Sequence, residues 1–148
     1  MIIDPQKAYA WLTNAEEGNI QQSGIDVRLK SLTAITGGRL GKTEKRVDIS
    51  PVDCLGGWFT LLAGDYDFAC YEHVVMPEDC CAILIQRSSL NRLGLYITTG
   101  LYDNGFHNYI GGVLHVPHTV EIEEGCRIAQ IIFIKSESRS TYRGQYNG

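Results

Sequence analysis

The 148-residue sequence has no run of about 20 apolar residues, the length that an α-helix needs to cross a membrane. Its first residues also lack the basic and then apolar pattern of a secretory signal. There is no basic stretch, and 17 acidic residues outnumber 13 Lys and Arg, for a net charge of -4. This balance argues against a protein that grips nucleic acid, although a small anion needs only a few donors. We therefore expect a cytoplasmic protein with no membrane and no nucleic-acid partner.

Several catalytic motifs are missing as well. The sequence has no GxxxxGK(S/T) phosphate loop, no GxGxxG and no HExxH. It also lacks the H-x-E and P-C-x-x-C signature of the zinc deaminases. None of its five cysteines pairs at the spacing of a zinc or redox motif, and an odd number is typical of reduced thiols that pack as small apolar side chains. Any deamination would therefore proceed without zinc.

Short apolar or alternating runs make up most of the chain, and one helix is indicated. Asp4 can cap this helix, Pro5 suits its first turn, and it should end by Gly18. The runs predict strands at 25–29, 58–62, 66–71, 81–85, 95–98, 109–116 and 128–134. Many short strands with almost no second helix predict one all-β domain over 1–148, a barrel or a sandwich.

Two polar stretches interrupt this pattern. The Gly-rich segment 36–45 predicts a mobile loop. The segment 135–148 is rich in Ser, Arg, Tyr and Gly and has little to bury. It predicts a flexible C-terminal tail that is disordered, or ordered only on a ligand or a neighbouring subunit.

Two clusters carry side chains suited to chemistry. Gln86–Arg92 follows an apolar run and combines two cations, two hydroxyls and two amides. It is either a solvated turn or an anion site, because Arg and Ser donors suit phosphate oxygens. The second cluster, 98–106, predicts a hairpin with Asn104-Gly105 at its turn. An acid at the tip and an aromatic residue nearby could bind a base and position a water, or the segment could be a plain turn.

Taken in order, five segments resemble the dUTPase / dCTP deaminase superfamily, and its dCTP deaminase branch in particular. They are 23–29, similar to S-x-D-V/L-R-L; 87–95, RSSLNRLGL against RSSLARLGL; 99–106, TGLYDNGF against AGxIDPGF or GxIDxDY; 125–130, GCRIAQ against G-x-RIAQ; and 142–145, YRGQ against YQGQ. The resemblance implies a distorted β-barrel or jelly-roll-like, dUTPase-like fold, here with a short N-terminal helix. It also implies a homotrimer with sites between subunits, which binds dUTP or dCTP together with Mg²⁺ held through the phosphates.

The resemblance also implies roles for individual residues. Asp103 matches the acid that orients and deprotonates the water that attacks the α-phosphorus. Phe106 matches the aromatic residue beneath the deoxyribose, whose flat face excludes a 2′-hydroxyl. The implied substrate-binding residues are Arg87, Ser88, Ser89, Arg92, Gly100, Phe106, Gln130, Tyr142 and Gln145, of which Tyr142 and Gln145 belong to the tail that closes over the site. Asp26 either contributes to the magnesium shell or braces the first strand, and we favour bracing.

Departures from the family pattern bear on the reaction. Zinc-independent deaminases carry a Glu ten residues beyond the motif Asp, where this chain has Val113. Residues 113 and 115 share one face of a strand, so His115 is either a substitute proton carrier or a structural His. The Gly-rich final motif of dUTPases is missing, and His107-Asn108 replaces their Arg-Gly. Asp103 is retained.

Three functions follow. Because Asp103 is present and the Glu is not, the sequence favours a hydrolase that converts dUTP to dUMP and pyrophosphate. The alternatives are a dCTP deaminase that uses another group such as His115, and a nucleotide-binding member of the fold without activity. Preference for uracil or cytosine would rest on backbone hydrogen bonds near Gly100 and the tail, which side-chain types do not reveal.

Overall fold

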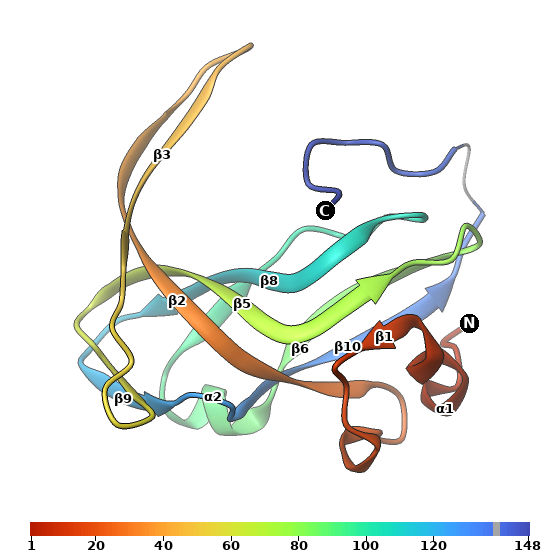
Figure 1. Ribbon diagram of the computed structural model, residues 1–148, viewed down its shortest axis with the longest axis horizontal. Helices are drawn as coiled ribbons and strands as arrows, with labels where there is room; N and C mark the ends of the chain where they lie inside the picture. Colours follow the sequence, from red (N-terminus) through yellow and green to blue (C-terminus); the bar gives the residue numbers. More distant parts are fainter. Residues whose placement is uncertain (138–139) are drawn as a thin grey trace.

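Antiparallel strands dominate the fold (Figure 1). The computed structural model describes residues 1–137 and 140–148. Its elements are α1 (Pro5–Ala8), the 3₁₀ turn η1 (Tyr9–Trp11), β1 (Leu12–Thr13), the 3₁₀ turn η2 (Glu17–Asn19), β2 (Ile25–Leu40), β3 (Lys45–Pro51), β4 (Trp58–Leu61), β5 (Gly64–Val75), β6 (Cys80–Gln86), α2 (Ser88–Arg92), β7 (Tyr96–Thr98), β8 (His107–Val116), β9 (Val120–Glu123) and β10 (Arg127–Lys135). No helix among the described residues is long and apolar enough to span a membrane.

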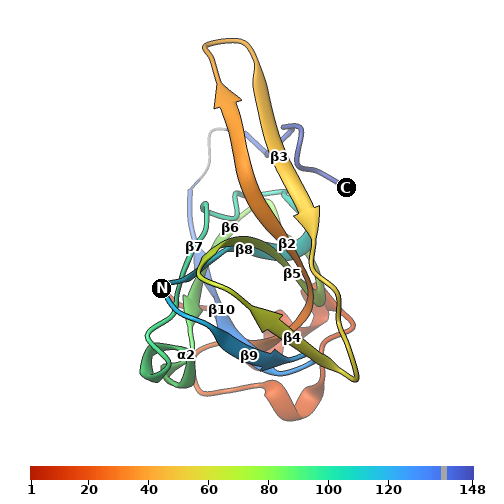
Figure 2. The ribbon, with the colours of Figure 1, turned by 90° about the vertical axis from the view of Figure 1, so that its left-hand side faces the viewer.

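One sheet bends into an almost closed barrel. Within the described residues its strand order is β6-β10-β2-β5-β8-β7, with β1 beside β5 and β3 beside β2. The two edges meet where Ala82 of β6 and Tyr102 exchange backbone hydrogen bonds of 2.9 and 3.0 Å. Strands β4 and β9 form a separate two-stranded sheet (Figure 2). The predicted all-β, barrel-like fold with a short N-terminal helix is confirmed.

The N-terminal helix begins where the sequence predicts. The carboxylate of Asp4 accepts a hydrogen bond from the Gln6 backbone N–H at 2.9 Å, and Pro5 occupies the first turn. The α-helix is shorter than expected, because a 3₁₀ turn replaces it from Tyr9 to Trp11. Trp11 packs edge-on against Phe133, with ring centroids 5.3 Å apart, so this segment is anchored on β10.

The prediction of a mobile loop at 36–45 is wrong. β2 continues to Leu40 and β3 begins at Lys45, so the segment forms a two-stranded arm that projects from the barrel (Figure 2). A Cβ atom on Gly38 would lie 2.4 Å from the carbonyl oxygen of Arg46 on the paired strand. Gly38 therefore permits the close pairing of β2 and β3. The Gly-rich composition of the segment, taken alone, suggests a flexible loop instead.

The cysteines are all unpaired thiols, as the sequence predicts. Cys70 and Cys80 are buried, and burial raises the pKa of both thiols above the ordinary value. Cys54 is exposed and does not contribute to the core. The packing role therefore holds for the buried cysteines and not for Cys54.

Alternation along β2 places polar residues outside the barrel wall. Ile25, Val27 and Leu29 are completely buried in the core. Asp26 and Arg28 lie between them and therefore face the opposite side of the sheet. β2 and β10 thus present a polar outer surface over an apolar interior, and this surface carries the first part of the candidate site.

Gly111 of β8 provides a test of strand packing. A Cβ atom added here would lie 2.4 Å from the carbonyl oxygen of Phe68, so the neighbouring backbone would have to shift. We expect Gly111→Ala to lower the free energy of unfolding by about 1–3 kcal/mol, the usual cost of overpacking. Urea denaturation measures this cost. Gly18→Ala is the matched control, since nothing lies within 4 Å of its Cβ position, and equal effects of the two substitutions would contradict the packing.

Candidate functional site

A groove with a volume of about 350 Å³ lies beside Asp26 on the outer surface of β2. It is lined by Gln21, Asp26, Ile85, Gln86, Arg87, Ser88, Gln130 and Ile132. The register of β10 on β2 sets Gln130 directly opposite Asp26. The structure thus brings together Arg87, Ser88 and Gln130, three of the implied substrate-binding residues.

Asp26 holds the donors of this groove in place. Its side chain is 2% exposed, and the carboxylate accepts hydrogen bonds from Gln21 at 3.0 Å, Arg127 at 3.2 Å and Gln130 at 3.4 Å. Nε of Arg87 lies 3.7 Å from the same carboxylate. This ion pair is longer than a hydrogen bond, so the Arg87 guanidinium keeps N–H groups that can bind an anion. Asp26 thus orients donors from Gln21, Arg127 and Gln130, and its bracing of the first strand stays a prediction.

The chain enters α2 immediately after Arg87. The backbone N–H of Arg87 donates to the carbonyl oxygen of Ile128 at 3.0 Å, which fixes the end of β6 on β10. Ser88 lines the groove, whereas Ser89 faces a larger neighbouring cavity. Arg92, in the last turn of α2, is exposed and lines neither of these cavities. The polar cluster is thus a short helix beside the groove, and its members divide between two surfaces.

Asp103 lies elsewhere, in the turn that leads into β8. Its carbonyl oxygen accepts a hydrogen bond from the N–H of Phe106 at 3.0 Å, and Gly105 has a φ of 81°, in the left-handed region that suits glycine. The side-chain amide of Asn104 donates to the carbonyl oxygen of Glu78 at 2.9 Å and anchors the turn. The carboxylate of Asp103 is exposed and can reach a ligand. The predicted turn and hairpin are confirmed.

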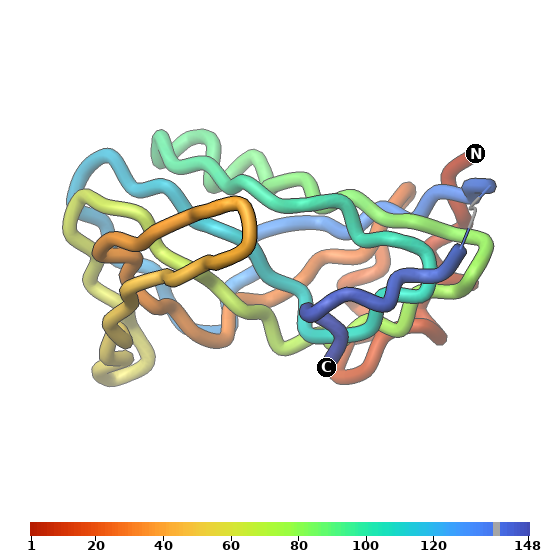
Figure 3. Tube along the Cα trace, turned by 90° about the horizontal axis from the view of Figure 1, so that it is seen from above, coloured from red at the N-terminus to blue at the C-terminus, as the bar shows by residue number. Residues whose placement is uncertain are grey.

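The C-terminal segment 140–148 lies on this turn (Figure 3). The backbone N–H of Tyr142 donates to the carbonyl oxygen of Asn104 at 2.7 Å, and its ring packs edge-on against Phe106 at a centroid distance of 5.4 Å. Gln145 is exposed. The described part of the segment thus finds a backbone acceptor and an aromatic surface on its own chain. The flexibility of the tail and its closing over bound substrate stay predictions.

The groove and the Asp103 turn are separate in one copy of the chain. Neither Asp103, Gly100 nor Phe106 lines the groove. Figure 1 shows α2 below the barrel and the C-terminal segment above the start of β8. A single copy therefore does not bring the predicted acid to the predicted phosphate-binding residues.

His115 on β8 has a partner at each ring nitrogen. Nδ1 lies 2.7 Å from a carboxylate oxygen of Asp65, and Nε2 lies 2.9 Å from the hydroxyl oxygen of Thr98. The imidazole also stacks on Tyr96, with ring centroids 4.5 Å apart. Sequence reasoning missed Asp65 and Thr98 because strand pairing, and not proximity along the chain, places them beside His115.

An acid lies beside Val113, although none occurs along β8 itself. Strand register sets Asp67 of β5 opposite Val113 on one side and Thr98 of β7 opposite it on the other. Burial raises the pKa of the Asp67 carboxyl above its ordinary value, and the positive charge of Lys45 opposes that shift. Cross-strand neighbours project from the same face of a sheet, so the Asp67 side chain lies beside that of Val113. The sequence of β8 alone shows only an apolar residue at this position.

Comparisons with known proteins identify the family of this chain. A family model described as dCTP deaminase-like matches residues 5–136. A probable deoxyuridine 5'-triphosphate nucleotidohydrolase of Aeropyrum pernix is 31% identical over 137 residues, which cover 88% of this chain and 86% of that protein. The chain belongs to the dCTP deaminase-like family.

Two deaminases are also similar to this chain. A dCTP deaminase of Pyrobaculum calidifontis is 39% identical over 79 residues, which are 52% of this chain and 45% of that protein. The crystal structure of 2'-deoxycytidine 5'-triphosphate deaminase from Agrobacterium tumefaciens superposes with a TM-score of 0.70 at 16% identity, covering 89% of this chain and 46% of that one. The match thus spans less than half the length of either deaminase, and the structural likeness shows a shared fold.

Proposed function

We propose that this chain hydrolyses dUTP to dUMP and pyrophosphate, in the cytoplasm and without a nucleic-acid partner. The observation that carries the proposal is the exposed carboxylate of Asp103 together with Val113 in the place of the deaminase Glu. Hydrolysis at the α-phosphorus needs a group that takes a proton from water, which a carboxylate provides. Deamination needs a proton carrier near the base, and a valine side chain carries none. The similarity to the Aeropyrum pernix protein supports the same choice.

A homotrimer completes the site in this proposal. Because Asp103 lies away from the groove in one copy, a triphosphate bound in one groove would meet the Asp103 turn of a neighbouring copy. Arg87, Ser88 and Gln130 would donate to its phosphate oxygens, since charged and amide donors of this kind suit phosphate. Phe106 would lie beneath the deoxyribose.

The groove fits a triphosphate that binds with Mg²⁺. Guanidinium, amide and hydroxyl groups of Arg87, Gln130 and Ser88 face it, and these suit phosphate oxygens. The triphosphate itself supplies the oxygen ligands that Mg²⁺ prefers. When bound, Mg²⁺ neutralises negative charge on the phosphates. Asp103 has the complementary task of orienting the attacking water and accepting its proton.

Incubation with each deoxynucleoside triphosphate and Mg²⁺, followed by separation of the products, tests the proposal. We expect dUMP and pyrophosphate from dUTP, and no ammonia from dCTP. Tight binding of dUTP without turnover of any nucleotide would select a binding protein instead. Light scattering on the same preparation tests the trimer independently of activity.

One observation favours deamination of dCTP as a second candidate. His115 is held between Asp65 and Thr98, so its ring is oriented on the face of β8 that also carries Val113. An oriented imidazole is a competent acid and base near neutral pH. If ammonia is released from dCTP, His115→Asn should abolish that release while leaving any pyrophosphate release from dUTP intact. Complete absence of ammonia removes this candidate.

Phe106 is expected to discriminate against ribonucleotides. Its ring is held between Tyr102 and Tyr142, at centroid distances of 5.5 and 5.4 Å, so it presents a fixed face. Phe106→Leu should lower the ratio of kcat/KM for dUTP over UTP by about tenfold, because a smaller side chain leaves room for the 2′-hydroxyl. Phe106→Tyr keeps the ring and should keep the ratio. Steady-state kinetics with both substrates measure this, and an unchanged ratio in Phe106→Leu would contradict the assignment.

A further inference from the structure

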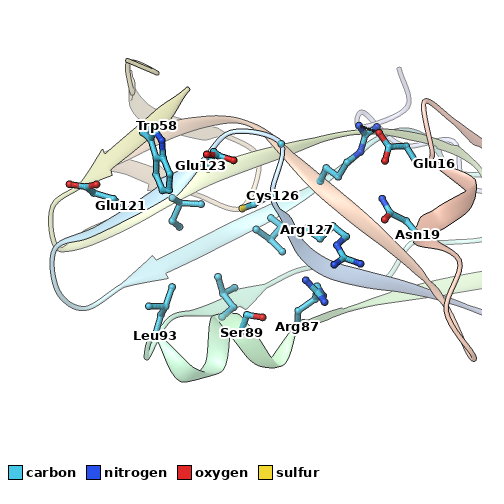
Figure 4. Close-up of a pocket in the computed structure, with 15 residues that line it drawn as sticks. Glu16, Asn19, Trp58, Arg87, Ser89, Leu93, Glu121, Glu123, Cys126 and Arg127 are labelled. Carbon is cyan, nitrogen blue, oxygen red and sulfur yellow. Dashed lines mark hydrogen bonds and ion pairs between the residues drawn. The ribbon is translucent and has the colours of Figure 1, made fainter. Parts of the chain in front are cut away.

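A second cavity shares Arg87 with the groove, and Figure 4 shows the residues that line it. Its volume of about 610 Å³ lies within the range of small-molecule sites. Strands β4 and β9, helix α2 and the segment 16–19 contribute to its walls. Asp103, Phe106 and the C-terminal segment do not line it. Of the implied substrate-binding residues only Arg87 and Ser89 line it, and the proposed hydrolysis gives the rest of this cavity no role.

Hydrogen-bond donors gather at one end of the cavity. Figure 4 shows Arg127 and Asn19 at this end, with Arg87 below them. Arg87 and Arg127 each direct one nitrogen to Asp26, which leaves other N–H groups on both guanidiniums. Glu16 also lies at this end, but it is paired with Arg28 at 2.7 Å.

Asn19 gives independent evidence for a ligand. The residue is 7% exposed, and among the residues that the structure describes its side-chain nitrogen has no hydrogen-bond partner. A buried amide without a partner is costly, and native structures keep few of them. A ligand that carries an acceptor in the cavity would satisfy this nitrogen.

The other end of the cavity combines an aromatic ring with two carboxylates. Strand register pairs Trp58 of β4 with Glu123 of β9, and Glu121 lies two residues away on the same face of β9. Figure 4 shows these two carboxylates on either side of Trp58, away from Arg127 and Asn19. Within residues 1–137 and 140–148, neither carboxylate forms an ion pair. This end can therefore stack on a flat ring and accept hydrogen bonds from it.

We propose that the cavity binds a nucleoside monophosphate whose base carries an amino group. The phosphate accepts hydrogen bonds from Arg87, Arg127 and the unpartnered amide of Asn19. The base lies on Trp58, and its amino group donates to the carboxylate of Glu123, which strand register places opposite Trp58. A uracil or thymine base would direct a carbonyl oxygen at that carboxylate, so nucleotides with those bases bind more weakly.

Fluorescence of Trp58 tests binding at this cavity directly. The chain has two tryptophans, so Trp11→Phe leaves Trp58 as the single one. Titration of this full-length variant with dCMP should change the fluorescence saturably. The changes with dUMP and with inorganic phosphate should need concentrations higher by about tenfold or more. Because Trp58 does not line the groove, binding of dUMP at the proposed substrate site does not give this signal.

Substitutions at the two ends identify the binding mode. Asn19→Asp removes a donor and adds a negative charge near the phosphate, so it should weaken dCMP binding by about tenfold or more. Gln22→Glu makes the same chemical change on an exposed residue outside the cavity and should have no effect. Glu123→Gln should remove the preference for dCMP over dUMP, whereas Glu124→Gln should retain it.

Two outcomes would overturn the proposal. One is the absence of any saturable change in Trp58 fluorescence with dCMP. The other is a preference for dCMP that persists in Glu123→Gln. Release of pyrophosphate from dUTP by the same variants is measured separately, so failure of this inference and failure of the proposed hydrolysis are distinguishable.

Discussion

Asp103→Asn is expected to lower kcat for dUTP hydrolysis by about 10²- to 10⁴-fold, the usual contribution of general acid–base catalysis. Asn has the same shape as Asp, and the turn is held by the backbone of Asp103 and the side chain of Asn104, so the fold should survive. The amide cannot accept the proton of the attacking water. KM should change little, because Asp103 does not line the groove that holds the phosphate donors.

Pyrophosphate release under steady-state conditions measures both constants. Asp53→Asn is the matched control, since Asp53 is another exposed carboxylate and lies in the connection between β3 and β4. Its kcat should stay within about twofold of the parent, as expected for a surface charge away from the site. Full kcat in Asp103→Asn would contradict the proposed role. An equal loss in Asp53→Asn would show that the effect comes from net charge.

Most of the strands that the sequence predicts have one buried face. β10 and the first half of β2 bury every second side chain in the core, and this alternation is visible in the sequence. β3 shows the opposite case. Six of its seven residues are exposed, so no alternation marks it, and Gly37-Gly38 before it looks like a loop signal. Pairing with the second half of β2 makes this segment a strand.

The same distinction holds for the candidate site. Some of its features depend on residues that are neighbours in the chain, and others depend on strands that are far apart in sequence. Arg87 and Ser88 are neighbours in the chain, and their contribution to an anion site could be predicted from their types. The bracing of Arg87 by Asp26, and the position of Asp67 beside Val113, depend on the register of strands far apart in sequence. A one-residue change of register would turn these side chains to the other face. Residue types along one strand do not contain that information.

Glu72→Ala is expected to lower the free energy of unfolding by about 3–5 kcal/mol, the usual cost of breaking a buried ion pair. Glu72 is completely buried, and its two carboxylate oxygens accept hydrogen bonds from the backbone N–H and from Nε of Arg28, both at 2.9 Å. Without Glu72, the Arg28 side chain, which is 19% exposed, loses its buried partner and the backbone N–H loses its acceptor. Removing one partner is costly because the groups that remain cannot reach water.

Glu16→Ala tests whether burial of the ion pair, and not charge pairing alone, sets the loss of stability. Glu16 also pairs with the Arg28 guanidinium, at 2.7 Å. The Glu16 side chain is 60% exposed, so its loss should cost about 0–1 kcal/mol. Urea denaturation of both variants measures the difference, and equal costs would contradict the dependence on burial. Salt gives a second check. In about 1 M NaCl, where the Debye length falls to about 3 Å, the effect of Glu16→Ala should fade. The effect of Glu72→Ala should persist, since ions do not enter the space between buried partners.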